Sequence, residues 1–586
     1  MTTSPTTRRR DVWRCVLAMT VLVGTPLGAA VELTQLTNAP CADDLVTWQV
    51  AGGPAEWNVL DVEHLPRLVV TSPSGRTWTR PAFLDQDFTA PDAAASTPPA
   101  PHGAPMLRIR HAPRVAGVHG WKLLGPDGAE LAQGQLSVAP ARTAGAHVGP
   151  LQIARDNLRL LGFRDGAVFI PIGPNLCWAN APDQLGGFAR WFAALHAAGA
   201  THVRLWFAGW CGGLEGAQPD AYRLDQAWLM DRILDLARGA GIKVTLVLDN
   251  HHDLKHGTLP YGGDFNARVK TFFTVPPPAQ YERRLRYVLA RWGSDDTVAA
   301  WELYNEVDLA QGDRDAALKW ATGAAALLAR LDQDHRPRTI SWSADDWDQV
   351  AAVPDIDLIQ IHSYVLEWSD PIGLLKQGHH DGVAMLCDNA RRANDLAKPF
   401  CFAELGYQGS NEKNPGNDLD TAGLLMRQQL WAGFLLGGYG GGMDWWWDTH
   451  LDKAKLWDVY RGLATAVARV DWHDKELAPL QPNAGSSLRI IGWQSPRQAL
   501  LWPQIRSDTW YRHLVEGKPR PQLVRALPFR LGGFKAGTAF RVHALDQVSG
   551  DEQGVATATS SAQGELEIVA PAPGRDTVLW VEDGAK

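Results

Sequence analysis

Two glutamates, Glu306 and Glu404, are the residues in this 586-residue sequence whose type and spacing most clearly suggest chemistry. Each lies at the end of a short apolar run, WELYNE at 301–306 and PFCFAEL at 399–405. A protonated carboxyl group can donate a proton to a departing oxygen, and an ionised carboxylate can attack carbon or activate water. The environment divides these roles by separating the two pKa values. The pair therefore predicts cleavage of a glycosidic bond.

Four further polar residues could support this chemistry. Arg204 is permanently charged, so we expect it to lower the pKa of Glu404 and hold that carboxylate ionised. Tyr364 could donate a hydrogen bond to the same carboxylate. Asn305 offers an amide to the 2-hydroxyl of a sugar, and His362 could orient the other glutamate.

The elements that must position these residues follow an alternating pattern. Short apolar runs, predicted to be strands, alternate with helical segments at 187–198, 229–239, 281–292 and 315–331. The predicted strands are 168–173, 202–206, 243–250, 299–306, 339–344, 358–364, 399–405 and 441–447. Both a (β/α)8 TIM barrel and an open doubly wound sheet would give this alternation. Polar residues gather at the carboxyl ends of many strands, which favours the barrel.

The fold class is therefore predicted to be α/β, with the (β/α)8 barrel at 150–475 as the catalytic domain. Residues 31–145 and 476–586 lack helical periodicity and consist of short β-rich runs set off by Gly and Pro. They predict an N-terminal and a C-terminal β-sandwich. The stretch 90–105 is rich in Pro and Ala and predicts a loop within the first of them.

The first thirty residues resemble an export signal. Three arginines at positions 8–10 precede an apolar stretch at 15–23 and small residues at 28–30. The run 9–14 is similar to a twin-arginine signal, and an ordinary secretory signal is the alternative. Both predict a periplasmic or secreted protein.

Charge and cysteine content exclude several classes. The chain has 64 acidic and 56 basic residues and a formal net charge of −8, which predicts no nucleic-acid or membrane partner. No segment after the signal offers about 18 uninterrupted apolar residues. The five cysteines that follow the signal predict neither a disulfide framework nor a zinc ribbon, although Cys177 and Cys211 could form a bridge.

Tryptophan is abundant, with 26 residues. Those in helical patterns, Trp191, Trp228, Trp292 and Trp320, are expected in the core. Others lie near strand ends, where indole faces could stack on pyranose rings: Trp178, Trp206, Trp210, Trp445, Trp446 and Trp447. For Trp493, Trp502 and Trp510 we expect packing, with a carbohydrate-binding module as the alternative.

At these positions the chain resembles glycoside hydrolase clan A, especially family 5 with its β-mannanases and cellulases. The resemblance covers roughly 163–472 and is carried by Arg204, Asn305-Glu306, His362-Ser363-Tyr364, Glu404 and a tryptophan within 445–447. It implies Glu306 as acid/base and Glu404 as nucleophile in a retaining hydrolysis of β-1,4-mannan or β-1,4-glucan, without a cofactor. The usual Asn-Glu-Pro is Asn-Glu-Val here, with Val307.

A metal site is conceivable at 249–253 with His256, because His252 and His256 are four residues apart. The run lacks the glutamate of a metalloprotease motif, and Pro260 suggests a loop. We therefore predict no metal and expect Asn250, His251 or His252, most simply His251, to line a sugar subsite.

The same residues are also compatible with two further functions. One is a non-catalytic carbohydrate-binding protein on this fold, and the other is a transglycosylase that uses the same two glutamates. The oligomeric state cannot be predicted from the sequence.

Overall fold

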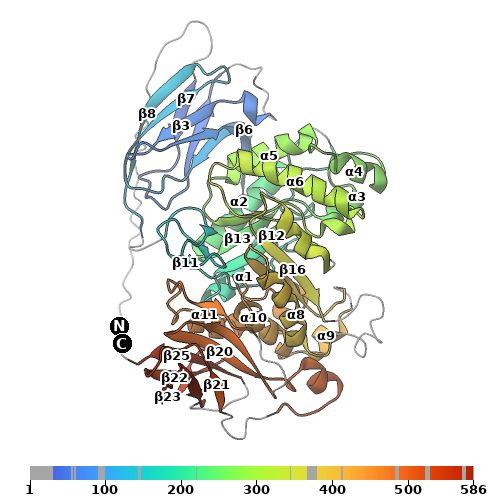
Figure 1. The fold of residues 1–586 in the computed structure, drawn as a ribbon. Helices are drawn as coiled ribbons and strands as arrows, with labels where there is room; N and C mark the ends of the chain where they lie inside the picture. Colours follow the sequence, from blue (N-terminus) through green and yellow to red (C-terminus); the bar gives the residue numbers. More distant parts are fainter. Residues whose placement is uncertain are drawn as a thin grey trace, which may run out of the picture. The chain divides into compact units, whose positions relative to one another are not determined.

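The computed structural model describes residues 31–53, 57, 61–89, 99–142, 147–218, 221–343, 345–365, 379–410, 413–481, 487–521, 528–570 and 576–584 (Figure 1). The predicted export signal and residues 90–98 of the Pro/Ala stretch lie outside them. The chain divides into two compact units, Met1–Asp85 with Met106–Arg142, and Gln86–Pro105 with Thr143–Lys586. The C-terminal sheet thus belongs to the same unit as the parallel strands, and the three predicted domain boundaries stay predictions.

Two antiparallel sheets contain the strands of the N-terminal region. One has the order β1 (Glu32–Gln35), β2 (Val46–Ala51), β6 (Ala100–His111), β5 (Phe83–Thr89), and the other β4 (Thr77–Pro81), β3 (Arg67–Thr71), β7 (Gly117–Leu124), β8 (Glu130–Val138). Buried and partly exposed residues alternate along β2 and β3, as the period of two in a strand requires. Trp48, Leu68, Ile109, Leu123 and Leu136 from both sheets share one hydrophobic core.

Parallel strands and helices form the central part of the second unit, so the fold class is α/β. The order β12 (His202–Trp206), β13 (Lys243–Val247), β14 (Val298–Glu302), β15 (Arg338–Thr339) makes one parallel sheet, and β16 (Ile359–Tyr364) pairs with β17 (Phe400–Gly406). Every residue of β12, β14 and β17 is buried. Strands that are covered on both faces lose the alternation seen in the first unit.

Helices follow most of these strands and lie around them (Figure 1). The α-helices are α1 (Gln184–Ala197), α2 (Leu224–Gly239), α3 (His251–His256), α4 (Phe265–Phe272), α5 (Ala279–Trp292), α6 (Arg314–Leu331), α8 (Gly382–Asn394), α9 (Pro415–Leu419), α10 (Leu424–Leu435) and α11 (Arg461–Val467). Asp313 and Asp381 begin α6 and α8, because each carboxylate accepts a hydrogen bond from a main-chain N–H of the first turn. None of the helices in the described ranges has both the length and the apolar character needed to cross a membrane.

Main-chain hydrogen bonds continue beyond the regular strands. Leu358 N donates to Arg338 O (3.1 Å), which links β16 to β15, and Met443 N donates to Phe402 O (2.9 Å) in β17. Asn175 N then donates to Asp444 O (3.0 Å), and Leu176 N donates to Arg204 O (2.9 Å) in β12. The contacts therefore lead from β12 through the strands and back to β12.

Three predicted strands differ from the expectation. In 339–344 only Thr339 lies in a regular strand, β15. In 168–173 only Val168–Phe169 is a regular strand (β11), and it pairs antiparallel with β10 (Leu161–Gly162). Pro171 and Pro174 lack the N–H that a continuous ladder requires. In 441–447 a single bridge joins Asp444 to Leu405. This segment approaches α10 so closely that a Cβ at Gly442 would lie 2.4 Å from the Gln429 carbonyl oxygen.

The C-terminal sheet has the order β18 (Ala478–Pro479), β19 (Leu488–Gln494), β20 (Gln498–Ile505), β25 (Thr577–Asp583), β22 (Ala539–Asp546), β23 (Glu552–Thr559), next to the pair β21 (Phe529–Leu531) and β24 (Leu566–Ile568). It packs on α10, where the Trp493 indole N–H donates to Phe434 O (2.9 Å) and the two rings stack at 5.8 Å. Trp493, Trp502 and Trp510 are at most 3% exposed. They pack inside the unit, as expected.

Three local predictions are wrong. The loop predicted at 90–105 does not extend over 100–105, because these residues belong to strand β6 (Ala100–His111). Cys177 and Cys211 are both free buried thiols and form no bridge. The segment 251–256 is a helix rather than a loop, because the Asn250 side chain caps its first turn and Gly257 ends it in the left-handed conformation, with φ 68°, before Pro260 is reached.

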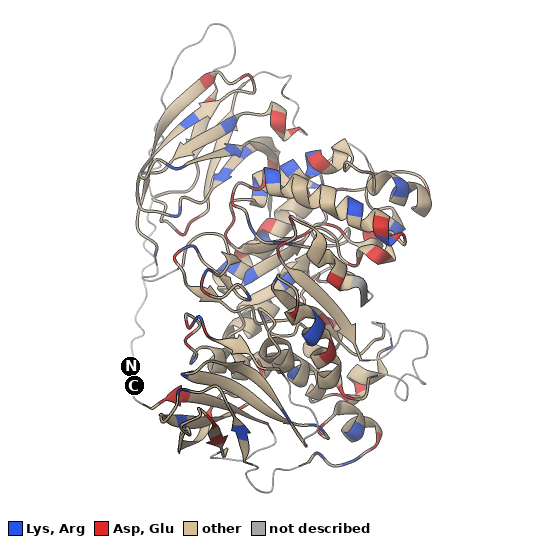
Figure 2. Ribbon diagram, in the orientation of Figure 1, with Lys and Arg blue, Asp and Glu red and all other residues tan. Residues whose placement is uncertain are grey.

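Charged residues of both signs are interspersed over the described chain (Figure 2).

Candidate active site

The two glutamates predicted from the sequence lie in one groove of about 1050 Å³. Glu306 follows β14 and Glu404 lies in β17, and a carboxylate oxygen of each lies within 4.8 Å of the other. The groove is lined by Trp178, Asn180, Trp206, Trp210, His251, His252, Lys255, Asn305, Glu306, Leu309, Ser343, His362, Tyr364, Glu404, Gln408, Gly409, Ser410, Trp445 and Trp446.

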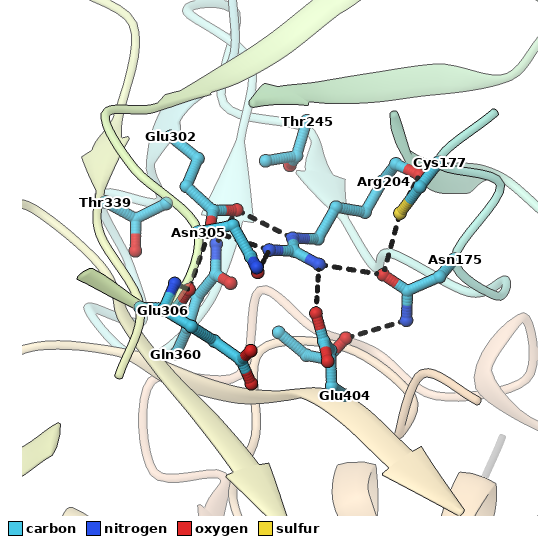
Figure 3. Close-up of polar contacts among 12 residues, drawn as sticks. Asn175, Cys177, Arg204, Thr245, Glu302, Asn305, Glu306, Thr339, Gln360 and Glu404 are labelled. Carbon is cyan, nitrogen blue, oxygen red and sulfur yellow. Dashed lines mark hydrogen bonds and ion pairs between the residues drawn. The ribbon is translucent and has the colours of Figure 1, made fainter. Parts of the chain in front are cut away.

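Arg204 lies beneath the groove and is 1% exposed. Its Nη1 donates to Glu404 Oε1 (2.7 Å) and to Asn175 Oδ1 (3.1 Å), and its Nη2 donates to Asn305 Oδ1 (2.5 Å). Its Nε and Nη2 also donate to Glu302 at 2.7 Å each (Figure 3). All five N–H groups of the guanidinium are thus in use, so the side chain is fixed in position.

Glu302 and Asn175 contribute to this network, and neither was predicted from the sequence. Glu302 could have been recognised from the sequence, because an ionisable residue inside an apolar parallel strand must have a partner that compensates for its burial. Asn175 gave no such signal, since it lies in an irregular segment that contains no alternation.

The Glu306 carboxyl group is held by residues of several elements. His362 Nδ1 lies 2.9 Å from its Oε1, which agrees with the expected orienting contact. The main-chain N–H of Glu306 donates to Ser341 Oγ (2.9 Å), and the Glu306 backbone is left-handed, with φ 49°. Burial and, next, the charge of Asp308 together raise the pKa of the Glu306 carboxyl to about 8, against the opposing effect of Arg204. This carboxyl therefore stays protonated at neutral pH.

The Glu404 carboxylate has three donors or cations around it. Tyr364 OH donates to Oε2 (2.9 Å), His362 Nδ1 lies 3.5 Å from Oε2, and Arg204 binds Oε1. Burial raises the pKa of this carboxyl, and His362, Arg204 and the Tyr364 hydrogen bond oppose the rise. Arg204 thus acts in the expected direction, but burial exceeds its effect, because the side chain is only 3% exposed.

His251, the first residue of α3, lines the same groove. Its Nδ1 lies 3.4 Å from Asn305 Nδ2 and 3.9 Å from Glu306 Oε2. Burial lowers its pKa to about 3, with a smaller contribution from His252, so the imidazole is neutral. Asn305 uses its Oδ1 for Arg204, so its amide nitrogen is the atom that contacts His251 in the groove that both residues line.

Five of the six strand-end tryptophans line the groove, namely Trp178, Trp206, Trp210, Trp445 and Trp446. Trp447 does not, which corrects its assignment as a substrate-binding residue. It is 1% exposed, and its indole N–H donates to the main-chain oxygen of Trp178 (3.1 Å). It packs behind the Trp178 ring, at a centroid distance of 4.8 Å.

Donor atoms of Glu306, His362 and Glu404 all lie within 4.8 Å of one another, a spacing that could hold a metal ion. The Arg204 guanidinium already provides a fixed positive charge 2.7 Å from Glu404. A second cation beside it would be repelled, so the donor set suits a proton-transfer pair better than a metal. The rings of His252 and His256 are parallel at 6.2 Å on α3.

No family model matches this chain. Mannan endo-1,4-beta-mannosidase A of Podospora anserina is 22% identical over 271 residues, which cover 43% of this chain and 68% of the relative. Mannan endo-1,4-beta-mannosidase 7 of Arabidopsis thaliana is 26% identical over 294 residues, covering 43% and 67%. The match to the probable mannan endo-1,4-beta-mannosidase F of Aspergillus flavus, 26% identical over 208 residues, spans 31% of this chain and 42% of the relative.

Among solved structures, a putative glycoside hydrolase from Bacteroides vulgatus has a TM-score of 0.58 at 15% identity, covering 93% of this chain and 99% of that one. This likeness concerns the fold. The chain is therefore similar in sequence to mannan endo-1,4-beta-mannosidases and in fold to a glycoside hydrolase.

Proposed function

We propose that the protein is a retaining glycoside hydrolase that cleaves internal β-1,4 linkages of mannan, with β-1,4-glucan as the alternative substrate. One observation carries the proposal: two carboxyl groups share a groove within 4.8 Å of each other, one bound by Arg204 and Tyr364 and the other with its pKa raised to about 8. Retaining enzymes have carboxyl groups about 5–5.5 Å apart and inverting enzymes about 6.5–9.5 Å, so the short spacing supports retention.

In the proposed mechanism Glu404 attacks the anomeric carbon while Glu306 protonates the departing glycosidic oxygen. This step forms a covalent glycosyl-enzyme and leaves Glu306 ionised. Glu306 then removes a proton from water, which attacks the same carbon and releases Glu404. His362 contacts both carboxyl groups, at 2.9 and 3.5 Å, and is placed to keep them aligned through both steps.

We also propose the architecture that the sequence predicts. The circuit of main-chain hydrogen bonds that leads from β12 back to β12 supports a closed (β/α)8 barrel with the groove at the carboxyl ends of its strands. The shared core of the two N-terminal sheets supports a β-sandwich. The resemblance of the first thirty residues to an export signal supports a periplasmic or secreted enzyme.

The choice of mannan is supported by the names of the relatives, and the groove supports a sugar polymer. Of the five tryptophans along it, Trp178, Trp210 and Trp445 are the more exposed and provide apolar ring faces for pyranose rings. Its volume of about 1050 Å³ is at the upper end of ordinary ligand pockets, as an oligosaccharide requires.

The test is digestion of β-mannans and β-glucans with product sizing, combined with NMR of the first anomer released. We expect short manno-oligosaccharides with retained configuration, and at least about 10³-fold lower activity in Glu306→Gln and Glu404→Gln. Glu282→Gln, on the outer surface of α5, is the matched control and keeps full activity. The mechanism is contradicted if both variants keep the activity of the wild type, or if the first product has the inverted anomeric configuration. Products longer than the substrate indicate a transglycosylase. Binding without cleavage indicates a carbohydrate-binding protein.

A further inference from the structure

Glu302 is a fully buried carboxylate at the end of β14, with 0% exposure, and it has no direct contact with the groove. Each of its oxygens accepts two hydrogen bonds. Oε1 accepts from Arg204 Nη2 (2.7 Å) and Ser341 Oγ (2.9 Å), and Oε2 accepts from Arg204 Nε (2.7 Å) and Gln360 Nε2 (2.8 Å). A carboxylate has about four acceptor positions, so Glu302 is saturated.

These bonds connect Glu302 to both glutamates of the groove. Through Arg204, whose Nη1 binds Glu404 Oε1, it fixes the cation beside the proposed nucleophile. Through Ser341, whose Oγ accepts from Glu306 N, it holds the backbone of the proposed acid in its left-handed conformation. Side chains from β12, from β16 and from the segment after β15 thus meet at Glu302, and Figure 3 shows Arg204 and Gln360 beside it.

The charges of this cluster do not balance with a single arginine. Arg204 contacts two carboxylates, Glu302 and Glu404, and carries one positive charge. The bidentate contact goes to Glu302, so part of the arginine's effect is already compensated before Glu404 is reached. A third negative charge at Glu306 would find no further partner among these contacts, which favours its protonated form.

We propose that Glu302 is a positioning residue: its buried negative charge fixes Arg204 against Glu404 and keeps Glu306 in the protonated form that acid catalysis needs. The inference deepens the proposed function and rests on it. It predicts that loss of this one charge changes the pH dependence of the reaction as well as its rate.

The decisive variant is Glu302→Gln, which keeps the size of the side chain and removes the charge. Both limbs of the pH profile of kcat/KM should move to lower pH, by about one unit, because each groove carboxyl loses a negative neighbour. We expect kcat to fall about 10- to 150-fold, the effect of losing one charged hydrogen bond, with KM changed less than about threefold. Limbs that stay in place while kcat falls would overturn the proposal.

Two charge-preserving variants are the controls. Ser341→Ala removes the hydrogen bond to Glu302 and the one from Glu306 N. Glu302→Asp shortens the side chain and keeps its charge. Both variants should lower kcat and leave the limbs of the kcat/KM pH profile in place. If Glu302→Gln does not fold, Glu302→Asp serves as the test. A shift of the limbs of its kcat/KM pH profile overturns the proposal, whereas a reduced kcat with both limbs at the wild-type pH supports it.

A readout without substrate separates this inference from the proposed function. Infrared difference spectra against Glu306→Gln follow the protonation of the Glu306 carboxyl directly, in the wild type and in Glu302→Gln. If the wild type cleaves no glycan, the proposed function fails. A lower apparent pKa of Glu306 in Glu302→Gln still supports the charge role of Glu302, and an unchanged one refutes it.

Discussion

Replacing Glu306 by glutamine should stabilise the folded protein at alkaline pH while it abolishes activity. The unfolded chain ionises this carboxyl near its ordinary pKa of 4.5, whereas burial keeps it protonated in the folded protein up to about pH 8. Between these values the unfolded state gains free energy from ionisation that the folded state lacks, so folding stability falls as the pH rises. Raising a pKa from 4.5 to about 8 corresponds to about 5 kcal/mol at pH 8.

The glutamine variant does not ionise and escapes this cost. Urea denaturation at pH 4.5, 6 and 8 should therefore give an advantage of Glu306→Gln over wild type that is smallest at pH 4.5 and reaches about 3–5 kcal/mol at pH 8. An advantage that does not depend on pH would show that Glu306 is not held protonated, and the assignment as acid would lose its physical basis.

Glu282 on α5 is the control, with the opposite sign. Partial burial raises the pKa of its carboxyl, but hydrogen bonds from Arg330 and Arg286 lower it overall. Glu282→Gln should therefore be slightly less stable than wild type above pH 4.5, with activity unchanged. The loss of folding stability that Glu306 causes at alkaline pH is of the kind expected for functional groups at active sites.

The remaining predictions concern the same groove and its support. After burial, the charge of Asp308 contributes most to the raised pKa of Glu306, and Asp308→Asn removes it. The alkaline limb of the kcat/KM profile, measured over pH 4–10, should therefore move to lower pH by roughly half to one unit. Tyr364→Phe removes the 2.9 Å hydrogen bond to Glu404, so kcat/KM should fall about 10- to 150-fold and the acid limb should move to higher pH; an unmoved acid limb argues against this role. Trp493→Ala should cost about 3–5 kcal/mol in urea denaturation, because the ring is fully buried against α10, and a loss below 1 kcal/mol would contradict its packing role.

Most of the predicted site residues are charged or aromatic side chains at the ends of apolar strands, which is why the sequence could single them out. Glu306, Glu404, Arg204, His362 and Tyr364 lie in four strands or just beyond their ends, and hydrogen bonds and ion pairs connect all five. Parallel strands end at the same side of a sheet, so the position of a residue at a strand end already places it near the others. Their roles in catalysis stay predictions.

The sequence could not predict how burial and charge combine. Arg204 was expected to keep the pKa of Glu404 low, but the strength of that effect depends on Glu302, which occupies the bidentate side of the guanidinium. Nothing in the spacing of Glu302 shows that it faces Arg204. The choice among three consecutive tryptophans failed for a similar reason, since the irregular backbone at 445–447 has no period from which the direction of Trp447 could be read.

Single residues determine where a helix begins and where a regular strand is interrupted, and the prediction from sequence missed two such places. The helix at 251–256 escaped prediction because it has only six residues, and its Asn250 cap gives a stronger signal than its length. The first predicted strand is interrupted by prolines, so its apolar pattern persists without a hydrogen-bonded ladder.

The segment that follows β20 of the C-terminal sheet also supports the groove, although none of its described residues lines it. Trp446, which lines the groove, donates from its indole N–H to the main-chain oxygen of Tyr407 (2.7 Å). The Tyr407 ring packs edge-on against Trp510 at 5.3 Å, and Trp510 in turn donates to the main-chain oxygen of His379 (3.0 Å). One wall of the groove is therefore supported by the segment that follows β20. A detachable carbohydrate-binding module would not share such buried contacts, so we infer that the C-terminal sheet is a structural part of the catalytic unit.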